Sequence, residues 1–132
     1  MVVEINVDED IELINAWAVI DAGEVVNADG VKNQIEGGII QATSCTLIEE
    51  VNFDGEIISA TDWENYPIIK FKQTPQIQVE LIDRPEEPFL GVGEAAHGPT
   101  AAAISNALFT AMNIRIKQLP ITRERIISSL NT

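Results

Sequence analysis

The strongest constraint on the fold lies where an extended apolar pair passes directly into a run of small residues. Gly91-Val-Gly-Glu94 follows Phe89-Leu90 and opens the run from Ala95 to Ala111. The pattern predicts a helix entered from an extended segment, and the glycines permit positive φ or a close approach of the backbone to a bound group. Glu94 at that junction is a candidate general base. A helix N-terminus also favours a glutamate through its dipole, and the motif taken alone favours this structural role.

Alternating apolar residues predict a β-hairpin at the start of the chain. Val3, Ile5 and Val7 alternate with polar residues, and residues 11–21 predict a second strand that is apolar on both faces toward its end. Asp8-Glu9-Asp10 between them is a turn signal. Residues 76–82 repeat the alternation and predict a further strand, and residues 56–59 predict a short one.

Three segments are predicted to be helical. The first runs from about residue 29 to residue 51, with Asn27 or Asp29 as its N-cap. Gly37-Gly38 lies inside it, and a glycine in a helix interior costs about 1 kcal/mol relative to alanine. The pair is tolerable if a neighbouring backbone or a ligand packs on that surface, and both alternatives stay open. The other two predicted helices are residues 99–112 and 123–130.

The order of these elements indicates the fold class. Strands and helices follow one another as β-β-α-β-β-α with a short tail, which predicts an α+β domain with an antiparallel sheet covered by helices. Residues 60–75 have no period and predict a long irregular connection, which in a compact domain often covers a functional site. A length of 132 residues fits one domain or a piece of a larger chain.

Charge is divided unevenly along the chain. Residues 1–64 hold fifteen Asp and Glu and one basic residue, whereas residues 65–132 hold six acidic and seven basic residues. The acidic half argues against nucleic acid and anionic membranes as partners and fits either solubility or docking to a basic neighbour. No apolar stretch is long enough for a membrane span, and the acidic N-terminus is not a signal peptide. A cytoplasmic location is therefore expected.

The single cysteine and the single histidine give little basis for a metal site. Cys45 excludes an internal disulfide framework and is predicted to be a small buried residue of the first helix rather than a nucleophile. His97 lies three residues after Glu94, and a surface position at the start of a helix is favoured over a role in tuning the base or facing a substrate.

Two separated motifs match one protein family in order and spacing. The first extends from Asp21-Ala-Gly23 through Asn27 to Gln34-Ile-Glu36-Gly37-Gly38, and the second is Gly91-Val-Gly-Glu94-Ala-Ala-His-Gly-Pro99 with the alanine-rich segment behind it. Together they resemble the C-terminal end of the molybdopterin-binding subunit of the xanthine dehydrogenase and aldehyde oxidase family. Within that family, the chain is most similar to the bacterial nicotinate dehydrogenase and isoquinoline 1-oxidoreductase types. The resemblance covers almost the whole chain.

The resemblance implies a molybdenum hydroxylase that oxidises N-heterocycles or aldehydes with a molybdenum–molybdopterin cofactor. In that family the glutamate corresponding to Glu94 takes the proton from the metal-bound hydroxyl, and the oxygen then attacks an electron-poor carbon. Gln34 is expected to reach the pterin, whose edge suits an amide that donates and accepts hydrogen bonds. Gly93 is expected to let the backbone pass close to the cofactor. Electrons leave through iron–sulfur clusters on other subunits, so the protein mainly positions the cofactor and supplies the base.

Three residues depart from the family pattern. Ala95 and Ala28 stand where many relatives have proline, which removes rigidity and leaves the chemistry intact. Asn33 stands where glycine is frequent and is expected to alter slightly how Gln34 is presented.

The upstream part of such a subunit and the cysteines of iron–sulfur clusters are missing. Residues 1–132 are therefore expected to be a single domain, a C-terminal fragment or small separate subunit that is inactive alone. Its expected partners are the remainder of the molybdenum-binding subunit and an iron–sulfur subunit. Apolar surfaces left exposed predict some dimerisation of the isolated chain.

Two other interpretations compete with an enzyme fragment. One is a non-catalytic binding or assembly module of the same fold, and the other is an unrelated α+β ligand-binding domain. The enzyme hypothesis requires Glu94 and Gln34 to converge on one open face.

Overall fold

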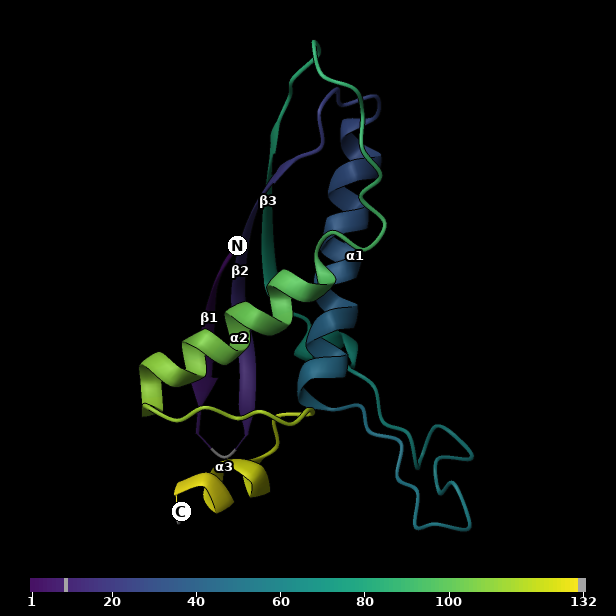
Figure 1. Ribbon diagram of the computed structural model, residues 1–132, viewed down its shortest axis with the longest axis vertical. Helices are drawn as coiled ribbons and strands as arrows, with labels where there is room; N and C mark the ends of the chain where they lie inside the picture. Colours follow the sequence, from purple (N-terminus) through teal and green to yellow (C-terminus); the bar gives the residue numbers. More distant parts are fainter. Residues whose placement is uncertain (9, 131–132) are drawn as a thin grey trace.

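The computed structural model describes residues 1–8 and 10–130, and within them a three-stranded sheet is covered on one face by helices (Figure 1). The α+β class predicted from the sequence is confirmed. The described elements are strands β1 (Val2–Val7), β2 (Ile11–Asp21) and β3 (Gln76–Ile82), helices α1 (Ala28–Leu47), α2 (His97–Met112) and α3 (Arg123–Leu130), and the 3₁₀ turn η1 (Phe71–Gln73).

The sheet is mixed, with β2 at its centre. β1 and β2 pair antiparallel, so the predicted hairpin is confirmed, although Glu9 of its turn lies outside the described residues. β3 pairs parallel to β2 from Asn15 opposite Gln76 to Asp21 opposite Ile82. The expectation of a wholly antiparallel sheet is therefore wrong for one of the two pairings. A helix and a long connection separate β2 from β3, and such a crossover returns the chain to the same end of the sheet.

Helix α1 begins where the sequence predicts and ends earlier. Asn27 is its N-cap, and the Asn27 Oδ1 accepts a hydrogen bond of 2.8 Å from the Gly30 N–H. At the other end the Ile48 N–H bonds to the Ser44 carbonyl, and the chain leaves the helix after Leu47 rather than at residue 51. None of the helices in the described residues is long and apolar enough to cross a membrane.

Helix α2 starts two residues before the predicted proline and crosses the sheet beside α1 (Figure 1). It ends at Asn113, whose φ of 56° is the left-handed conformation that commonly terminates helices. Helix α3 has the predicted bounds.

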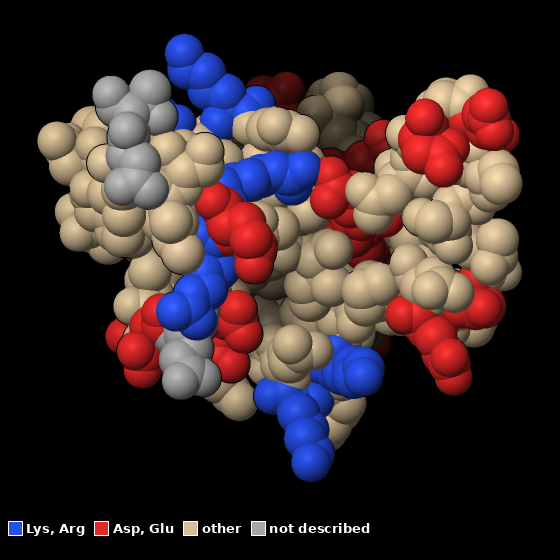
Figure 2. Space-filling model, turned by 90° about the horizontal axis from the view of Figure 1, so that it is seen from below, with Lys and Arg blue, Asp and Glu red and all other residues tan. Residues whose placement is uncertain are grey.

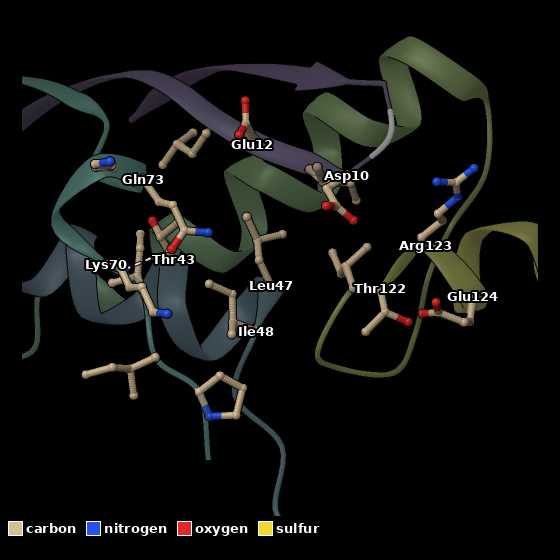
Figure 3. A pocket seen from close by; sticks show the side chains of 17 residues that line it. Asp10, Glu12, Thr43, Leu47, Ile48, Lys70, Gln73, Thr122, Arg123 and Glu124 are labelled. Carbon is tan, nitrogen blue, oxygen red and sulfur yellow. Dashed lines mark hydrogen bonds between the residues drawn. The ribbon is translucent and has the colours of Figure 1, made fainter. Parts of the chain in front are cut away.

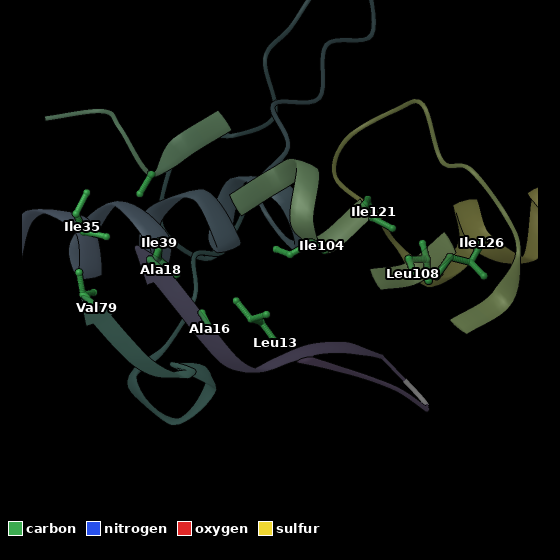
Figure 4. Close-up of a cluster of buried hydrophobic side chains, with 11 residues drawn as sticks. Leu13, Ala16, Ala18, Ile35, Ile39, Val79, Ile104, Leu108, Ile121 and Ile126 are labelled. Atoms are coloured by element: carbon green, nitrogen blue, oxygen red, sulfur yellow. The ribbon is translucent and has the colours of Figure 1, made fainter. Parts of the chain in front are cut away.

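The core lies between one face of the sheet and the helices (Figure 4). Leu13, Ala16 and Ala18 of β2 face it, and the small alanines let the helices come close to the sheet. The opposite face of β2 exposes Trp17 and Val19. The buried apolar side chains of this core are Leu13, Ala16, Ala18, Ile35, Ile39, Val79, Ala96, Ile104, Leu108, Ile121 and Ile126.

The strand predicted at residues 56–59 is not formed. Only an isolated bridge between Phe53 and Ile58 occurs there, within a long excursion that extends away from the sheet (Figure 1). The two apolar residues Ile57 and Ile58 have no neighbouring strand to pair with and stay exposed. The irregular connection predicted for residues 60–75 is confirmed, apart from η1 near its end.

A tight corner after β2 holds the loop that leads to the second motif. Gly23 has a φ of +71°, and its carbonyl accepts a hydrogen bond of 3.1 Å from the Arg84 N–H. The Leu90 N–H donates to the Ala22 carbonyl at 2.8 Å. Residues 84–90 are thereby fixed along the corner, which sets the position of the following Gly91-Val-Gly-Glu94 motif.

This corner makes Gly23→Ala a sensitive test of the fold. An added Cβ would lie 2.2 Å from the Pro88 carbonyl oxygen, in addition to the cost of a positive φ. We expect the free energy of unfolding to fall by more than about 2 kcal/mol. Gly55→Ala is the matched control, because Gly55 has a φ of +102° but no atom of the described residues within 4 Å of the added Cβ. Denaturant unfolding should show a smaller loss of about 1–2 kcal/mol for this control, and equal losses for both variants would contradict the proposed packing.

Candidate functional site

The two sequence motifs meet at a hollow of about 330 Å³ beside the first half of α1. The first motif contributes the corner after β2 and the start of α1, and the second contributes the segment just before Glu94. Most of the wall residues are apolar, and Glu24, Asn27 and Gln34 contribute the polar side chains. The lining residues are Ala22, Glu24, Val26, Asn27, Gly30, Val31, Gln34, Phe89, Leu90, Val92 and Gly93.

A direct hydrogen bond joins the motifs across this hollow. The Gln34 Nε2 donates to the Gly93 carbonyl oxygen at 3.1 Å, and both residues are exposed. Glu94 is the next residue, is also exposed, and accepts a bond of 3.1 Å from the His97 N–H through its main-chain carbonyl. The structure therefore brings Gln34 and Gly93 together at this hollow, and Glu94 follows Gly93 in the chain but is not among the residues that line the hollow.

The glycines of the second motif are not required by the packing of this chain. The described glycines with positive φ are Gly23 and Gly55, so Gly91 and Gly93 do not adopt the positive φ that glycine permits. A Cβ added at either position would have no atom of the described residues within 4 Å. The open space at Gly93, next to an amide on Gln34, fits a group bound against the backbone, as a pterin would be.

Charged groups stabilise the corner behind the hollow. The Asp21 carboxylate accepts a hydrogen bond from the Gly23 N–H at 3.1 Å and pairs with Arg84 at 3.1 Å. The Gly23 N–H and then the Arg84 guanidinium hold the pKa of Asp21 below its usual range. Because both side chains are about half exposed, this pair contributes mainly to the orientation of the loop.

The glycine pair of α1 divides into two roles. A Cβ added to Gly38 would lie 3.2 Å from the Ala96 Cβ and 3.6 Å from the His97 ring, so Gly38 allows α2 to begin against α1. A Cβ on Gly37 would meet no atom of the described residues within 4 Å. Of the alternatives left open by the sequence, close packing therefore applies to Gly38, whereas Gly37 faces open space.

His97 lies at the start of α2 as predicted, but the surface interpretation is only partly right. The side chain is half-buried, and its Nε2 lies 3.1 Å from the Gln41 Oε1. The Nδ1 is buried and has no hydrogen-bond partner in the described part of the chain. The ring thus lies between α1 and α2, directly behind the turn that carries Glu94.

The prediction that Cys45 is buried is wrong, because Cys45 is exposed. The residues of α1 on either side of it, Ser44 and Thr46, are buried instead. The buried face of α1 is made largely of small and hydroxyl-bearing residues, so its apolar pattern is too weak to assign Cys45 to a face. Desolvation and then the Glu49 carboxylate raise the pKa of the Cys45 thiol, which disfavours a nucleophilic thiolate.

A larger hollow, of about 610 Å³, lies at the opposite end of α1 and shares no residue with the first (Figure 3). It was not predicted, because its walls come from segments far apart in the sequence that carry no common motif. Acidic and basic side chains both surround it, and Glu94 is not part of it. Residues lining it include Asp10, Glu12, Thr43, Leu47, Ile48, Lys70, Lys72, Gln73, Ile121, Thr122, Arg123 and Glu124.

The fold and the paired motifs identify the class of protein. Residues 1–75 match the molybdopterin cofactor-binding domain, and the chain belongs to this family, that of the molybdenum-binding subunits of xanthine dehydrogenase and its relatives. The resemblance inferred from the two motifs is confirmed, and the chain is a member of an enzyme family of molybdenum oxidoreductases.

Individual relatives agree with this assignment. The chain is 46% identical to a nicotinate dehydrogenase subunit of Pseudomonas putida over 83% of its own length and 9% of that protein. It is 33% identical to the beta subunit of isoquinoline 1-oxidoreductase of Brevundimonas diminuta over 80% of its length and 13% of the relative. The chain thus spans only a small part of the relatives it matches.

A solved structure supports the same fold. The quinoline 2-oxidoreductase of Pseudomonas putida 86 superposes with a TM-score of 0.81 and 32% identity, over 92% of this chain and 16% of that one. The three-dimensional arrangement of the sheet and helices is therefore that of a molybdenum hydroxylase domain.

The separate roles of the two α1 glycines can be tested by one matched pair of variants. Gly38→Val is expected to lower the free energy of unfolding by about 1–3 kcal/mol, because the added methyl groups would force α2 away from α1. Gly37→Val is expected to change it by less than about 0.5 kcal/mol, since valine is slightly better than glycine in a helix and this position is open. Denaturant unfolding measures both values, and a loss at Gly37 as large as at Gly38 would refute the assignment.

Proposed function

We propose that this chain supplies the general base and part of the molybdopterin-binding surface of a molybdenum hydroxylase. Glu94 is the proposed base, and Gln34 and Gly93 are the proposed cofactor-binding residues. Three of the relatives carry the names nicotinate dehydrogenase, isoquinoline 1-oxidoreductase and quinoline 2-oxidoreductase, which supports an N-heterocycle as the substrate. An aldehyde is the second choice.

The hydrogen bond between the Gln34 Nε2 and the Gly93 carbonyl carries this proposal. It connects the motif of α1 to the motif that ends in Glu94, although 59 positions separate the two residues. A bound group that touches Gln34 would therefore also lie close to the backbone at Gly93, one position before Glu94. Chance similarity of two short motifs gives no reason for such a convergence.

Each residue has a defined task in this proposal. The Gln34 amide donates to Gly93, which orients its oxygen as an acceptor for a polar edge. The missing side chain at Gly93 leaves room for close approach, and the exposed apolar side chains of Phe89 and Leu90 help to exclude water. Glu94 takes up a proton through its carboxylate during the reaction. The molybdenum–molybdopterin cofactor, when bound, supplies the oxidation of the substrate carbon.

The proposed activity needs more protein than residues 1–132. The chain spans 9% and 13% of two curated relatives, and its three predicted site residues are all exposed. We propose that the rest of the molybdenum-binding subunit closes the site and that an iron–sulfur subunit accepts the electrons. On this proposal the isolated chain is inactive.

Replacing Glu94 by glutamine in the complete enzyme tests the base directly. Glutamine keeps the size of the side chain but cannot take up the proton, so turnover of an N-heterocycle such as nicotinate should fall about 10²- to 10⁴-fold. The molybdenum content should stay at the level of the unmodified enzyme, because the carboxylate is not proposed as a metal ligand. Turnover and metal content are measured on the same preparation.

Glu86→Gln is the matched control, since Glu86 is an exposed glutamate of the preceding loop outside the proposed site. It should leave both quantities unchanged. Normal turnover of the Glu94→Gln enzyme with full metal would disprove the role of Glu94 and would favour a non-catalytic binding or assembly module.

A further inference from the structure

A sixteen-residue excursion, residues 51–66, extends away from the sheet and helices and is called the arm here (Figure 1, lower right). All of its residues are described and none of them is buried. Trp63 is 76% exposed and Phe53 is 65% exposed. The large apolar side chains that the arm exposes are Val51, Phe53, Ile57, Ile58 and Trp63.

The arm has its own ordered shape without packing on the core. Asp54 caps one turn, where its Oδ1 accepts hydrogen bonds of 2.9 Å from the N–H groups of Glu56 and Ile57. Asp62 caps a second turn through bonds of 3.0 Å from Glu64 and Asn65. These turns shape the backbone of the arm, and its large apolar side chains stay exposed and are not part of the core.

The base of the arm is fastened to the body of the domain. The Tyr66 hydroxyl donates to the Glu49 Oε2 at 2.7 Å, and the Ile69 N–H donates to the buried Ser44 Oγ at 2.9 Å. Partial burial opposes ionisation of Glu49, but hydrogen bonds from Ser44 and Tyr66 outweigh it and lower the pKa of Glu49. A pre-ordered, anchored segment loses little entropy on binding.

Charge indicates which kind of surface the arm fits. Its sixteen residues include four carboxylates, Asp54, Glu56, Asp62 and Glu64, and no lysine or arginine. The right-hand lobe in Figure 2 shows acidic side chains around an uncharged surface and no basic ones. With a net charge of −13, a second copy of the chain is repelled at long range, whereas a basic surface is attracted.

We propose that the arm docks on an apolar surface rimmed by Lys and Arg in the part of the molybdenum enzyme outside residues 1–132. The inference rests on the proposed function, which requires such additional protein. Residues 1–132 match only 16% of the quinoline 2-oxidoreductase chain that shares this fold. Most of such an enzyme chain therefore lies outside the matched domain. Trp63 and Phe53 are the central anchors, since large aromatic side chains dominate the energetics of interfaces.

Hydroxyl-radical oxidation of Trp63, measured by mass spectrometry, tests the docking. Trp63 should be oxidised at least about ten-fold more slowly in the complete enzyme than in the isolated 132-residue chain, as expected for a side chain in the core of an interface. An equal rate in both preparations overturns the proposal. An isolated chain that forms a dimer in which Trp63 is already protected also overturns it, because the arm would then bind a second copy.

A pair of matched variants separates docking from folding. Ile57→Lys in the complete enzyme should restore rapid oxidation of Trp63, because it places a positive charge among apolar contacts that face basic groups. Ile127→Lys, at an exposed isoleucine of α3, should leave Trp63 protected. The isolated chain should unfold at the same temperature with and without Ile57→Lys, since the arm is outside the core. If Trp63 stays protected from oxidation in the Ile57→Lys enzyme, the arm is not the segment that makes the contact.

The docking and the proposed function can fail separately. Protection of Trp63 together with normal turnover of the Glu94→Gln enzyme would support the docking and reject the role of the base. Rapid oxidation of Trp63 in an enzyme that Glu94→Gln inactivates would reject the docking and support the base.

Discussion

The close contact between α1 and the start of α2, together with the corner after β2, positions the segments that form the candidate site. Gly38 has no side chain, so Ala96 packs directly on the helix, and the half-buried His97 bonds to Gln41 one turn further along α1. Glu94 belongs to the turn immediately before this contact, and Gln34 is on α1 one turn before Gly38. The backbone at Glu94 is thus constrained relative to α1 by helix packing on one side and by the hydrogen-bonded corner after β2 on the other.

The sequence predicted the individual strands and the start of α1 better than it predicted how the strands pair. The hairpin, β3 and the start of α1 follow from local periods and from the Asn27 cap, which a single segment contains. The parallel pairing of β3 with β2 depends on where a long connection returns the chain, and no local pattern records that. Residues 56–59 include the β-branched pair Ile57-Ile58, yet no strand edge is available beside them, so only a single bridge forms.

The polar character of the buried face of α1 accounts for the wrong prediction that Cys45 is buried. α1 buries Thr43, Ser44 and Thr46, and the Thr43 hydroxyl is satisfied by the Ile39 carbonyl at 2.7 Å. Hydroxyl groups that donate to the preceding turn can be buried at little cost. A buried helix face that carries them has no continuous apolar stripe, so it cannot be recognised from the sequence pattern. Among residues 43–46, Cys45 is the most apolar by type, yet it is the one that lies on the exposed face.

The site residues and the arm are both exposed in the isolated chain. The site residues Gln34 and Glu94 are exposed, and so are the aromatic residues of the arm and one whole face of the sheet. A carboxylate that acts as a base gains from the exclusion of water, which this chain does not provide by itself. On the proposed function, the surface that covers the site and the surface that receives the arm belong to the same additional protein. Docking through the acidic arm would then align that protein on the domain and close the site around Glu94 in a single association step.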